Sequence, residues 1–177
     1  MQDYDFRRYD GVWRRVEPTL EPYPQDATER GSDPCCMGTA AAEYAEVLAG
    51  YVAEERADRA WYLALARVAP QWARETLRAL AADEAEHAKT LEAAQYLIGG
   101  SVARTEALPR HDPPRSWLEA LREAYHDESC TAMNYERSAE ETTDACLAKL
   151  LGALGADEYR HAETVLGMLK RSMGARR

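Results

Sequence analysis

The chain has 177 residues, of which 46% are hydrophobic and 30% charged, a composition typical of soluble globular proteins. Its 31 acidic and 22 basic residues give a formal net charge of −9, and an acidic surface repels phosphate backbones, so we expect no nucleic-acid partner. No apolar run approaches the roughly 18 residues of a membrane span, and the N-terminus lacks the apolar core of a signal peptide. We therefore expect a cytoplasmic protein without membrane contact.

The cysteines carry little information about function. In the cytoplasm thiols are kept reduced, so we do not expect a disulfide framework from Cys35, Cys36, Cys130 and Cys146. They contain no CxxC pair of the kind that holds zinc or a rubredoxin-type iron. We interpret Cys130 as a small buried side chain.

The predicted elements divide the chain into an N-terminal arm, residues 1–37, and a helical domain, residues 38–177. Aromatic residues and prolines gather in residues 1–34, which predicts one short helix near 3–16 followed by an extended arm. Beyond the arm the residues are mostly strong helix formers, and no β-branched run of strand length appears. Prolines, a Gly-Gly pair and one polar turn separate four predicted helices, 38–68, 71–98, 114–141 and 145–173. Helices of this length bury a shared apolar face, so we predict an all-α four-helix bundle.

An internal repeat relates the two halves of the helical domain. Residues 77–90 read LRALAADEAEHAKT and residues 151–164 read LGALGADEYRHAET, with nine identities in fourteen positions. The repeat continues upstream, where the first and third helices carry the same stripe, Leu48, Glu55, Tyr62 and Ala66 matching Leu121, Glu128, Tyr135 and Ala139. Seven residues make about two helical turns, so each stripe lies on one face. One glutamate is thereby placed inside each apolar stripe.

Folding each half into an antiparallel hairpin brings these acidic residues to one level. Glu55 and Glu84 are equidistant from the turn at Pro70, and Glu128 and Glu158 are equidistant from the turn at Thr143. His87 and His161 follow Glu84 and Glu158 by three residues and share their faces. Docking the hairpins about a pseudo-two-fold axis then places four glutamates and two histidines together in the core.

The pseudo-two-fold relation also fixes the topology. It requires helices 71–98 and 114–141 to run parallel, which needs a long crossover rather than a short turn between them. A 28-residue helix is roughly 42 Å long, and the connection 99–113 can reach roughly 50 Å. We therefore predict that this connection spans the bundle.

So many carboxylates stay ionised in a core only when cations compensate them. Four glutamates with one histidine per ion suit two iron or manganese ions better than copper or closed zinc sites. One Glu from each of two helices, with Glu-x-x-His from each of the other two, is the ligand pattern of di-iron and di-manganese bundles. The metal ligands we predict are Glu55, Glu84, His87, Glu128, Glu158 and His161.

The segment 50–66, GYVAEERADRAWYLALA, resembles the first helix of rubrerythrins, in the ferritin-like superfamily, with Arg59 and Tyr62 four and seven residues after the metal-binding Glu55. The resemblance covers about residues 40–170. It implies a ferritin-like bundle with two iron ions, bridged by Glu84 and Glu158. Because no CxxC pair is present, it implies a rubrerythrin-like protein without a rubredoxin domain and with a separate electron-donor protein.

Two further pairs of residues accompany the predicted ligands. Tyr62 and Tyr135 either pack in the core or donate a hydrogen bond to a ligand carboxylate, and they are the candidate catalytic side chains. Asp83 and Asp157 precede the two Glu-x-x-His motifs and are candidates to hold the second imidazole nitrogen of a bound histidine. In related di-iron proteins each Asp bonds the histidine of the opposite motif, but the histidine on the same helix is also within reach.

The function that this resemblance implies is an oxidoreductase that reduces peroxide or dioxygen, working as a homodimer. Three other functions use similar bundles: ferrous-iron oxidation for storage, manganese catalase activity, and assembly without catalysis. The N-terminal arm suggests none of them.

Overall fold

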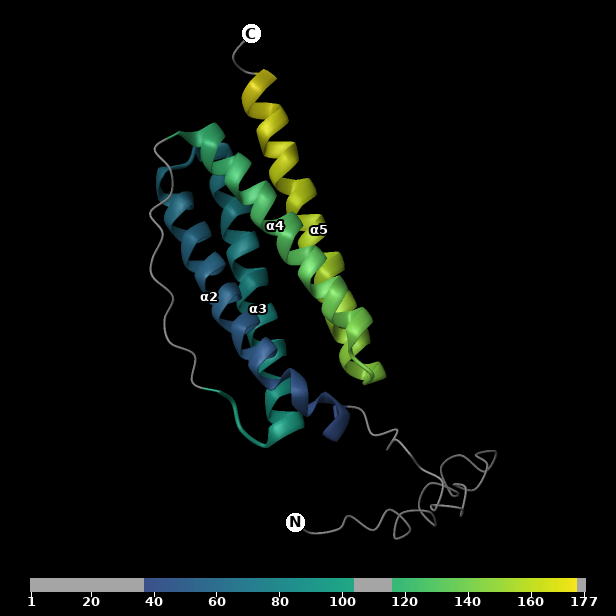
Figure 1. The fold of residues 1–177 in the computed structure, drawn as a ribbon. Helices are drawn as coiled ribbons and strands as arrows, with labels where there is room; N and C mark the ends of the chain where they lie inside the picture. The colour runs from purple at the N-terminus through teal and green to yellow at the C-terminus, as the bar shows by residue number, and fades with distance from the viewer. Residues whose placement is uncertain (1–36, 104–115, 175–177) are drawn as a thin grey trace, which may run out of the picture. The chain divides into compact units, whose positions relative to one another are not determined.

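A computed structural model describes residues 37–103 and 116–174 (Figure 1). Within these ranges the structure has long α-helices and no strand, which confirms the predicted all-α bundle. The helices are α2 (Ala45–Val68), α3 (Arg74–Gly99), α4 (Trp117–Glu141) and α5 (Ala145–Gly174), with short 3-10 helices η2 (Thr39–Tyr44) and η3 (Gln71–Ala73) ahead of α2 and α3. The helix predicted near 3–16 lies outside the described residues, and the domain boundary at residue 37 stays a prediction.

The helix boundaries follow from local chemistry. Helix α3 ends where Gly100 adopts a left-handed conformation (φ 68°) that its missing Cβ permits, with its N–H donating to Tyr96. Helix α4 begins after Ser116, whose hydroxyl accepts from the Glu119 N–H at 3.4 Å. The predicted starts at 38 and 114 were early, because η2 forms tighter 3-10 turns and Ser116 is the extended N-cap residue of α4.

Asp144 fixes the turn between α4 and α5. Its Oδ1 accepts hydrogen bonds from the N–H groups of Cys146 and Leu147, at 3.0 and 2.9 Å, and so caps the start of α5. Its other oxygen accepts from the Gly38 N–H at 3.3 Å. This buried carboxylate therefore joins the turn to the segment that leads into α2.

The helices form two antiparallel hairpins, α2 with α3 and α4 with α5. Figure 1 shows α3 and α4 pointing the same way, so α4 starts at the opposite end of the bundle from the end of α3. This arrangement confirms the predicted crossover topology and the parallel relation of these two helices.

Apolar side chains fill the bundle above and below a central polar layer. One buried cluster contains Leu65, Leu77 and Leu121, and the other contains Leu48, Leu91 and Leu151. Side chains of Tyr62 and Tyr135 belong to opposite clusters and border the layer between them. The predicted stripes thus face the core, and their glutamates lie where the two apolar clusters meet.

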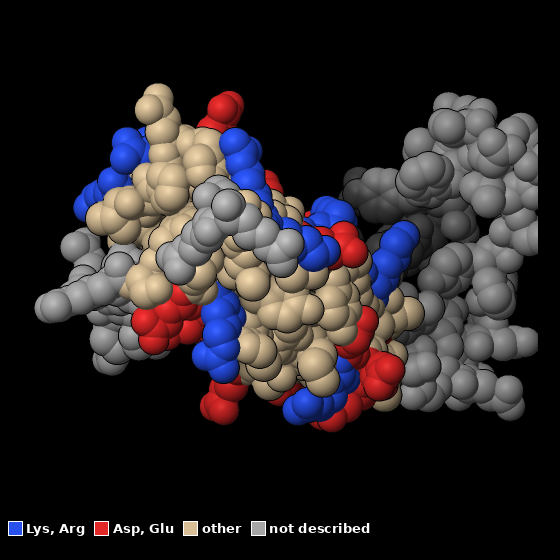
Figure 2. Space-filling model, turned by 90° about the horizontal axis from the view of Figure 1, so that it is seen from above, with Lys and Arg blue, Asp and Glu red and all other residues tan. Residues whose placement is uncertain are grey.

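The end of the bundle at which α5 ends shows acidic and basic side chains interspersed around its rim (Figure 2). Although the net charge is −9, the acidic residues therefore do not form a broad negative surface at this end. None of the described helices is both long enough and apolar enough to cross a membrane.

Two expectations about the cysteines were wrong. Cys146 forms a disulfide bond, whereas four reduced thiols were expected, because the pairing depends on which cysteines the fold brings together with their Cα atoms within about 6 Å. Cys130 is a free, exposed thiol rather than a buried one, because its position two residues after Glu128 turns it away from the core. Cys35 and Cys36 lie outside the described residues.

Candidate metal centre

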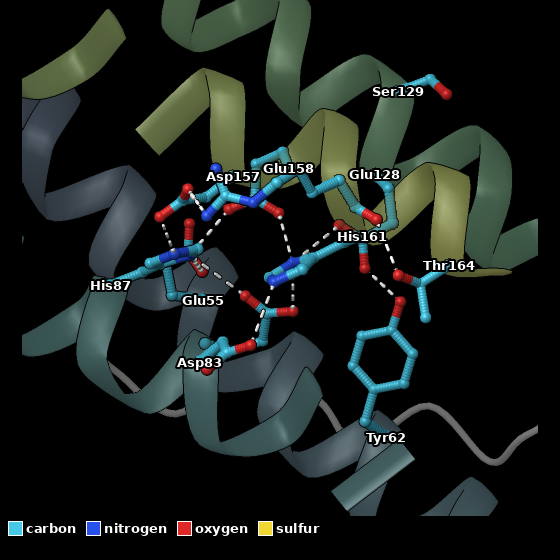
Figure 3. Close-up of polar contacts among 12 residues, drawn as sticks. Glu55, Tyr62, Asp83, His87, Glu128, Ser129, Asp157, Glu158, His161 and Thr164 are labelled. Carbon is cyan, nitrogen blue, oxygen red and sulfur yellow. Dashed lines mark hydrogen bonds and ion pairs between the residues drawn. The ribbon is translucent and has the colours of Figure 1, made fainter. Parts of the chain in front are cut away.

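The structure brings all six predicted ligands into one buried layer. Each of these residues is at most 6% exposed, although all six are ionisable. The six are Glu55 from α2, Glu84 and His87 from α3, Glu128 from α4, and Glu158 and His161 from α5. Figure 3 shows the side chains of Glu55, Glu128, Glu158 and both histidines pointing toward one another.

Each histidine turns its Nδ1 toward three carboxylates. His87 Nδ1 lies 2.7 Å from an oxygen of Glu158, 3.2 Å from Glu84 and 3.5 Å from Glu55. The two rings lie with their centroids 5.5 Å apart and nearly parallel, as the pseudo-two-fold axis requires. One nitrogen carries at most one proton and cannot donate to three oxygens at once, whereas a cation among them contacts all of them.

His161 repeats this arrangement on the other side of the axis. Its Nδ1 lies 3.1 Å from Glu158, 3.2 Å from Glu84 and 3.5 Å from Glu128. The ligand atoms therefore form two overlapping groups that share Glu84 and Glu158. One group adds Glu55 and His87, and the other adds Glu128 and His161.

Several of these buried atoms lack a hydrogen bond of acceptable geometry. Both carboxylate oxygens of Glu84, one oxygen of Glu158 and Nδ1 of His87 are in this state. Buried polar groups are normally satisfied, so orphaned carboxylate oxygens that converge on one point fit bound cations. The donor set of carboxylate oxygens with one imidazole per group fits two divalent metal ions.

In the metal-free cluster, protons provide the compensating charge. Burial raises the pKa of Glu55 to about 7 and that of Glu128 to about 9. Burial lowers the pKa of His87, but the nearby carboxylates of Glu158, Glu55 and Glu84 outweigh it and raise the value to about 12. Burial likewise raises the pKa of Glu158, but the imidazoles of His161 and His87 beside it outweigh this effect and lower the value to about 2.

The two tyrosines each donate a hydrogen bond to a carboxylate of the opposite hairpin. Tyr62 on α2 donates to Glu128 on α4, and Tyr135 on α4 donates to Glu55 on α2. Burial, followed by the charge of the bonded glutamate, raises the pKa of both phenols well above the usual value. Of the two roles left open by the sequence, the structure therefore shows the hydrogen-bonded one.

The aspartates are arranged across the bundle. Oδ2 of Asp157 lies 3.5 Å from Nε2 of His87, and Oδ2 of Asp83 lies 3.5 Å from Nε2 of His161. Each Asp therefore faces the histidine of the opposite hairpin and not the one on its own helix (Figure 3). This leaves Nδ1 of each imidazole directed at the glutamates.

Sequence reasoning missed Asp58. Its carboxyl is half-buried between α2 and α4, and burial, followed by the charge of Glu55, raises its pKa to about 8. Its spacing of three residues from Glu55 placed it on the same side of α2 and could have indicated this position. The repeat concealed it, because the equivalent residue in α4 is Thr131.

These observations define a four-helix bundle whose core holds a carboxylate and histidine cluster compatible with a di-metal site. The sequence model of the rubrerythrin family matches residues 46–169, which covers all of the ligand-bearing segments. The chain belongs to the rubrerythrin family. No curated protein and no solved structure matches it significantly.

Proposed function

We propose that the protein is a di-iron oxidoreductase that reduces hydrogen peroxide or dioxygen. The observation that supports this proposal most directly is the pair of overlapping ligand groups in the core, which share two glutamates. A closed structural zinc site uses four ligands dominated by Cys and His, and this cluster has a different donor set. Membership of the rubrerythrin family supports the same reading.

In this proposal Glu84 and Glu158 would help to hold both metal ions, because each belongs to both ligand groups. Glu55 with His87, and Glu128 with His161, complete the separate ends of the site. Oxygen-rich ligands with one imidazole per ion suit iron or manganese. We propose iron, because it changes oxidation state readily with such ligands and so supports electron transfer.

When bound, two ferrous ions would supply the two electrons that, with two protons, convert one hydrogen peroxide to two waters. The chain's own residues hold the ligands in place. Tyr62 and Tyr135 keep one oxygen of Glu128 and of Glu55 hydrogen-bonded, so each carboxylate presents its other oxygen to the centre. Asp83 and Asp157 face the Nε2 atoms of His161 and His87 and would favour the imidazole tautomers that carry a proton there. A separate donor protein would return the electrons.

Metal analysis joined to activity assays tests this proposal. We expect two ions per chain after reconstitution with iron, and consumption of peroxide that depends on an added reductant. Fewer than one ion per chain, after reconstitution with iron and with manganese, would contradict the di-metal assignment. Oxygen release from peroxide without a reductant would instead indicate catalase activity, and retention of many ferric ions per chain would indicate storage.

A further inference from the structure

The two halves of the bundle differ at one pair of equivalent positions. The repeat that matches Glu55 with Glu128 also matches Tyr51 of α2 with Ala124 of α4. The Tyr51 ring packs against Tyr135, with centroids 4.5 Å apart, and its hydroxyl contacts Ser138 Oγ at 2.8 Å. Ala124 has no such ring to place beside Tyr62. The interface between α2 and α4 is therefore filled beside one tyrosine and left open beside the other.

A pocket of about 410 Å³ occupies this open position. It lies between α2 and α4, and its wall includes Ala124, Tyr62 and the candidate ligand Glu128. Trp61 forms another part of the wall and packs edge-to-face on Tyr62 at 5.2 Å. The pocket thus reaches from the molecular surface to the Glu128 end of the candidate metal centre.

The polar side chains of this pocket are mostly acidic. Glu123 and Asp127 are exposed, Asp58 is half-buried, and Glu128 is nine-tenths buried. Among the described residues, those that line the pocket include no Lys, Arg or His. Behind Glu128 lie the orphaned oxygens of Glu84 and Glu158. A series of carboxylates therefore leads from the surface to buried oxygens that lack a hydrogen-bond partner and could bind a cation.

The opposite face of the centre has a second pocket, of about 380 Å³, between α3 and α5. Both imidazoles line it, and each turns its Nε2 toward an Asp that also lines it, so the rings separate this pocket from the converging glutamates. Arg160 adds a positive charge to its wall. A cation that enters from this side would have to pass both rings.

We propose that the pocket between α2 and α4 is the path by which divalent metal ions enter the buried centre, at its Glu128 end. The inference rests on the di-metal part of the proposed function and not on the reaction with peroxide. Carboxylates replace the water ligands of a metal ion one after another as it moves inward, and a wall of one sign attracts cations from solution. Ala124 keeps the path open, because the larger Tyr51 at the equivalent position of α2 fills the corresponding space in the other half of the bundle.

Replacement of Ala124 by Tyr tests the path sterically. Metal-free protein is mixed with Co²⁺, the reaction is stopped with EDTA at set times, and protein-bound cobalt is measured after desalting. We expect Ala124→Tyr to slow uptake by roughly tenfold or more, equivalent to an added barrier of about 1.4 kcal/mol, with the final cobalt content unchanged. The matched control is Ala153→Tyr, which makes the same change at an exposed position of the α3–α5 pocket and should leave the rate unchanged.

Neutralising the wall tests the path electrostatically and does not depend on whether Ala124→Tyr folds. The double variant Glu123→Gln, Asp127→Asn, which neutralises two exposed carboxylates of the wall, should slow cobalt uptake by about tenfold at low ionic strength and show a weaker dependence of the rate on salt. The matched control is Glu86→Gln, at an exposed position of the other pocket. It should leave both the rate and its salt dependence unchanged.

The results separate this inference from the enzymatic proposal. Cobalt uptake at the rate of the natural protein in both test variants, or slower uptake in the two controls alone, would show that the pocket between α2 and α4 is not the entry path. A natural protein that binds no cobalt would overturn the path together with the di-metal assignment. Normal cobalt uptake without peroxide reduction by the iron-loaded protein would overturn the enzymatic proposal alone.

Discussion

The hydroxyl of Tyr62 on α2 donates a hydrogen bond to Glu128 on α4, and both side chains are buried. The bond joins the two hairpins at the level of the candidate metal centre, and Tyr135 forms its counterpart with Glu55. Each hairpin thus orients a glutamate of the other. These bonds exist only when the hairpins are docked.

Removing this hydroxyl should weaken the fold. For Tyr62→Phe we expect the unfolding free energy to fall by about 1–3 kcal/mol, because the carboxyl of Glu128 loses a buried partner. Urea denaturation of metal-free protein measures the change. Tyr96→Phe, at a side chain that is 61% exposed, is the control and should stay within about 0.5 kcal/mol of the natural protein. Equal effects from both substitutions would argue against the hydrogen bond.

Adjacent glutamates on α2 should differ sharply in their effect on metal content. Glu55 is 1% exposed and lies within a ligand group, whereas Glu54 is exposed. We expect Glu55→Gln to reduce the number of bound ions, because a neutral amide is a poor ligand beside the remaining carboxylates. Glu54→Gln should bind the natural number. Metal analysis of both variants tests this difference. Loss of metal in Glu54→Gln, with the natural content in Glu55→Gln, would show that the register of α2 is shifted by one residue.

The aspartates should act on metal affinity through the histidines. We expect Asp157→Asn to weaken binding by about 10–100-fold, because His87 loses the carboxylate that faces its Nε2. Competition against a chelator of known affinity measures the change, and Asp83→Asn should behave alike through His161. Glu86→Gln on the exposed side of α3 is the control. Unchanged affinity in both Asp variants would show that the imidazoles need no such support.

The metal-free protein should lose stability as the pH rises. Unfolded glutamate titrates near 4.5 and unfolded histidine near 6.5, whereas the folded pKa is about 7 for Glu55, about 9 for Glu128 and about 12 for His87. Between pH 5 and 9 the folded state therefore binds more protons than the unfolded state. Each extra proton lowers the unfolding free energy by about 1.4 kcal/mol per pH unit.

Thermal melts of metal-free protein from pH 5.5 to 8.5 measure this dependence. We expect the melting temperature to fall over this range, and to fall less after metal is added, because bound ions replace the protons and stabilise the folded state by mass action. A melting temperature of the metal-free protein that rises with pH would show that the buried carboxyls are already ionised in the folded state.

Gly155 on α5 allows the close approach of α4 beside the centre. A Cβ at this position would lie 3.2 Å from the carbonyl oxygen of Ala132 and 3.3 Å from Cβ of Tyr135. We expect Gly155→Ala to destabilise the protein by about 1–3 kcal/mol through overpacking. Gly152→Ala, where nothing lies within 4 Å of the new Cβ, should instead stabilise it by about 0.5–1 kcal/mol. Denaturant midpoints of the two variants compare these effects directly.

The sequence by itself determined the helices, the hairpins and the depth at which the six ionisable side chains meet. Helical periodicity is a local property, so the stripe that contains Glu55 and the one that contains Glu128 could be read directly from the repeat. The distances of these residues from Pro70 and Thr143 then placed them at one level, because antiparallel helices match residues equidistant from their turn. The repeat also required the crossover that makes α3 and α4 parallel.

Only the tertiary structure decided which side chains meet across the hairpins. On one helix Asp83 is within reach of His87, and the rotation of the docked hairpins directs it to His161 instead. The same docking gives Tyr51 a partner in Tyr135 and leaves a pocket beside Ala124, a difference that depends on side-chain volume at the helix interface. Contacts of this kind depend on the relative rotation and separation of two helices, which no periodicity within either helix specifies.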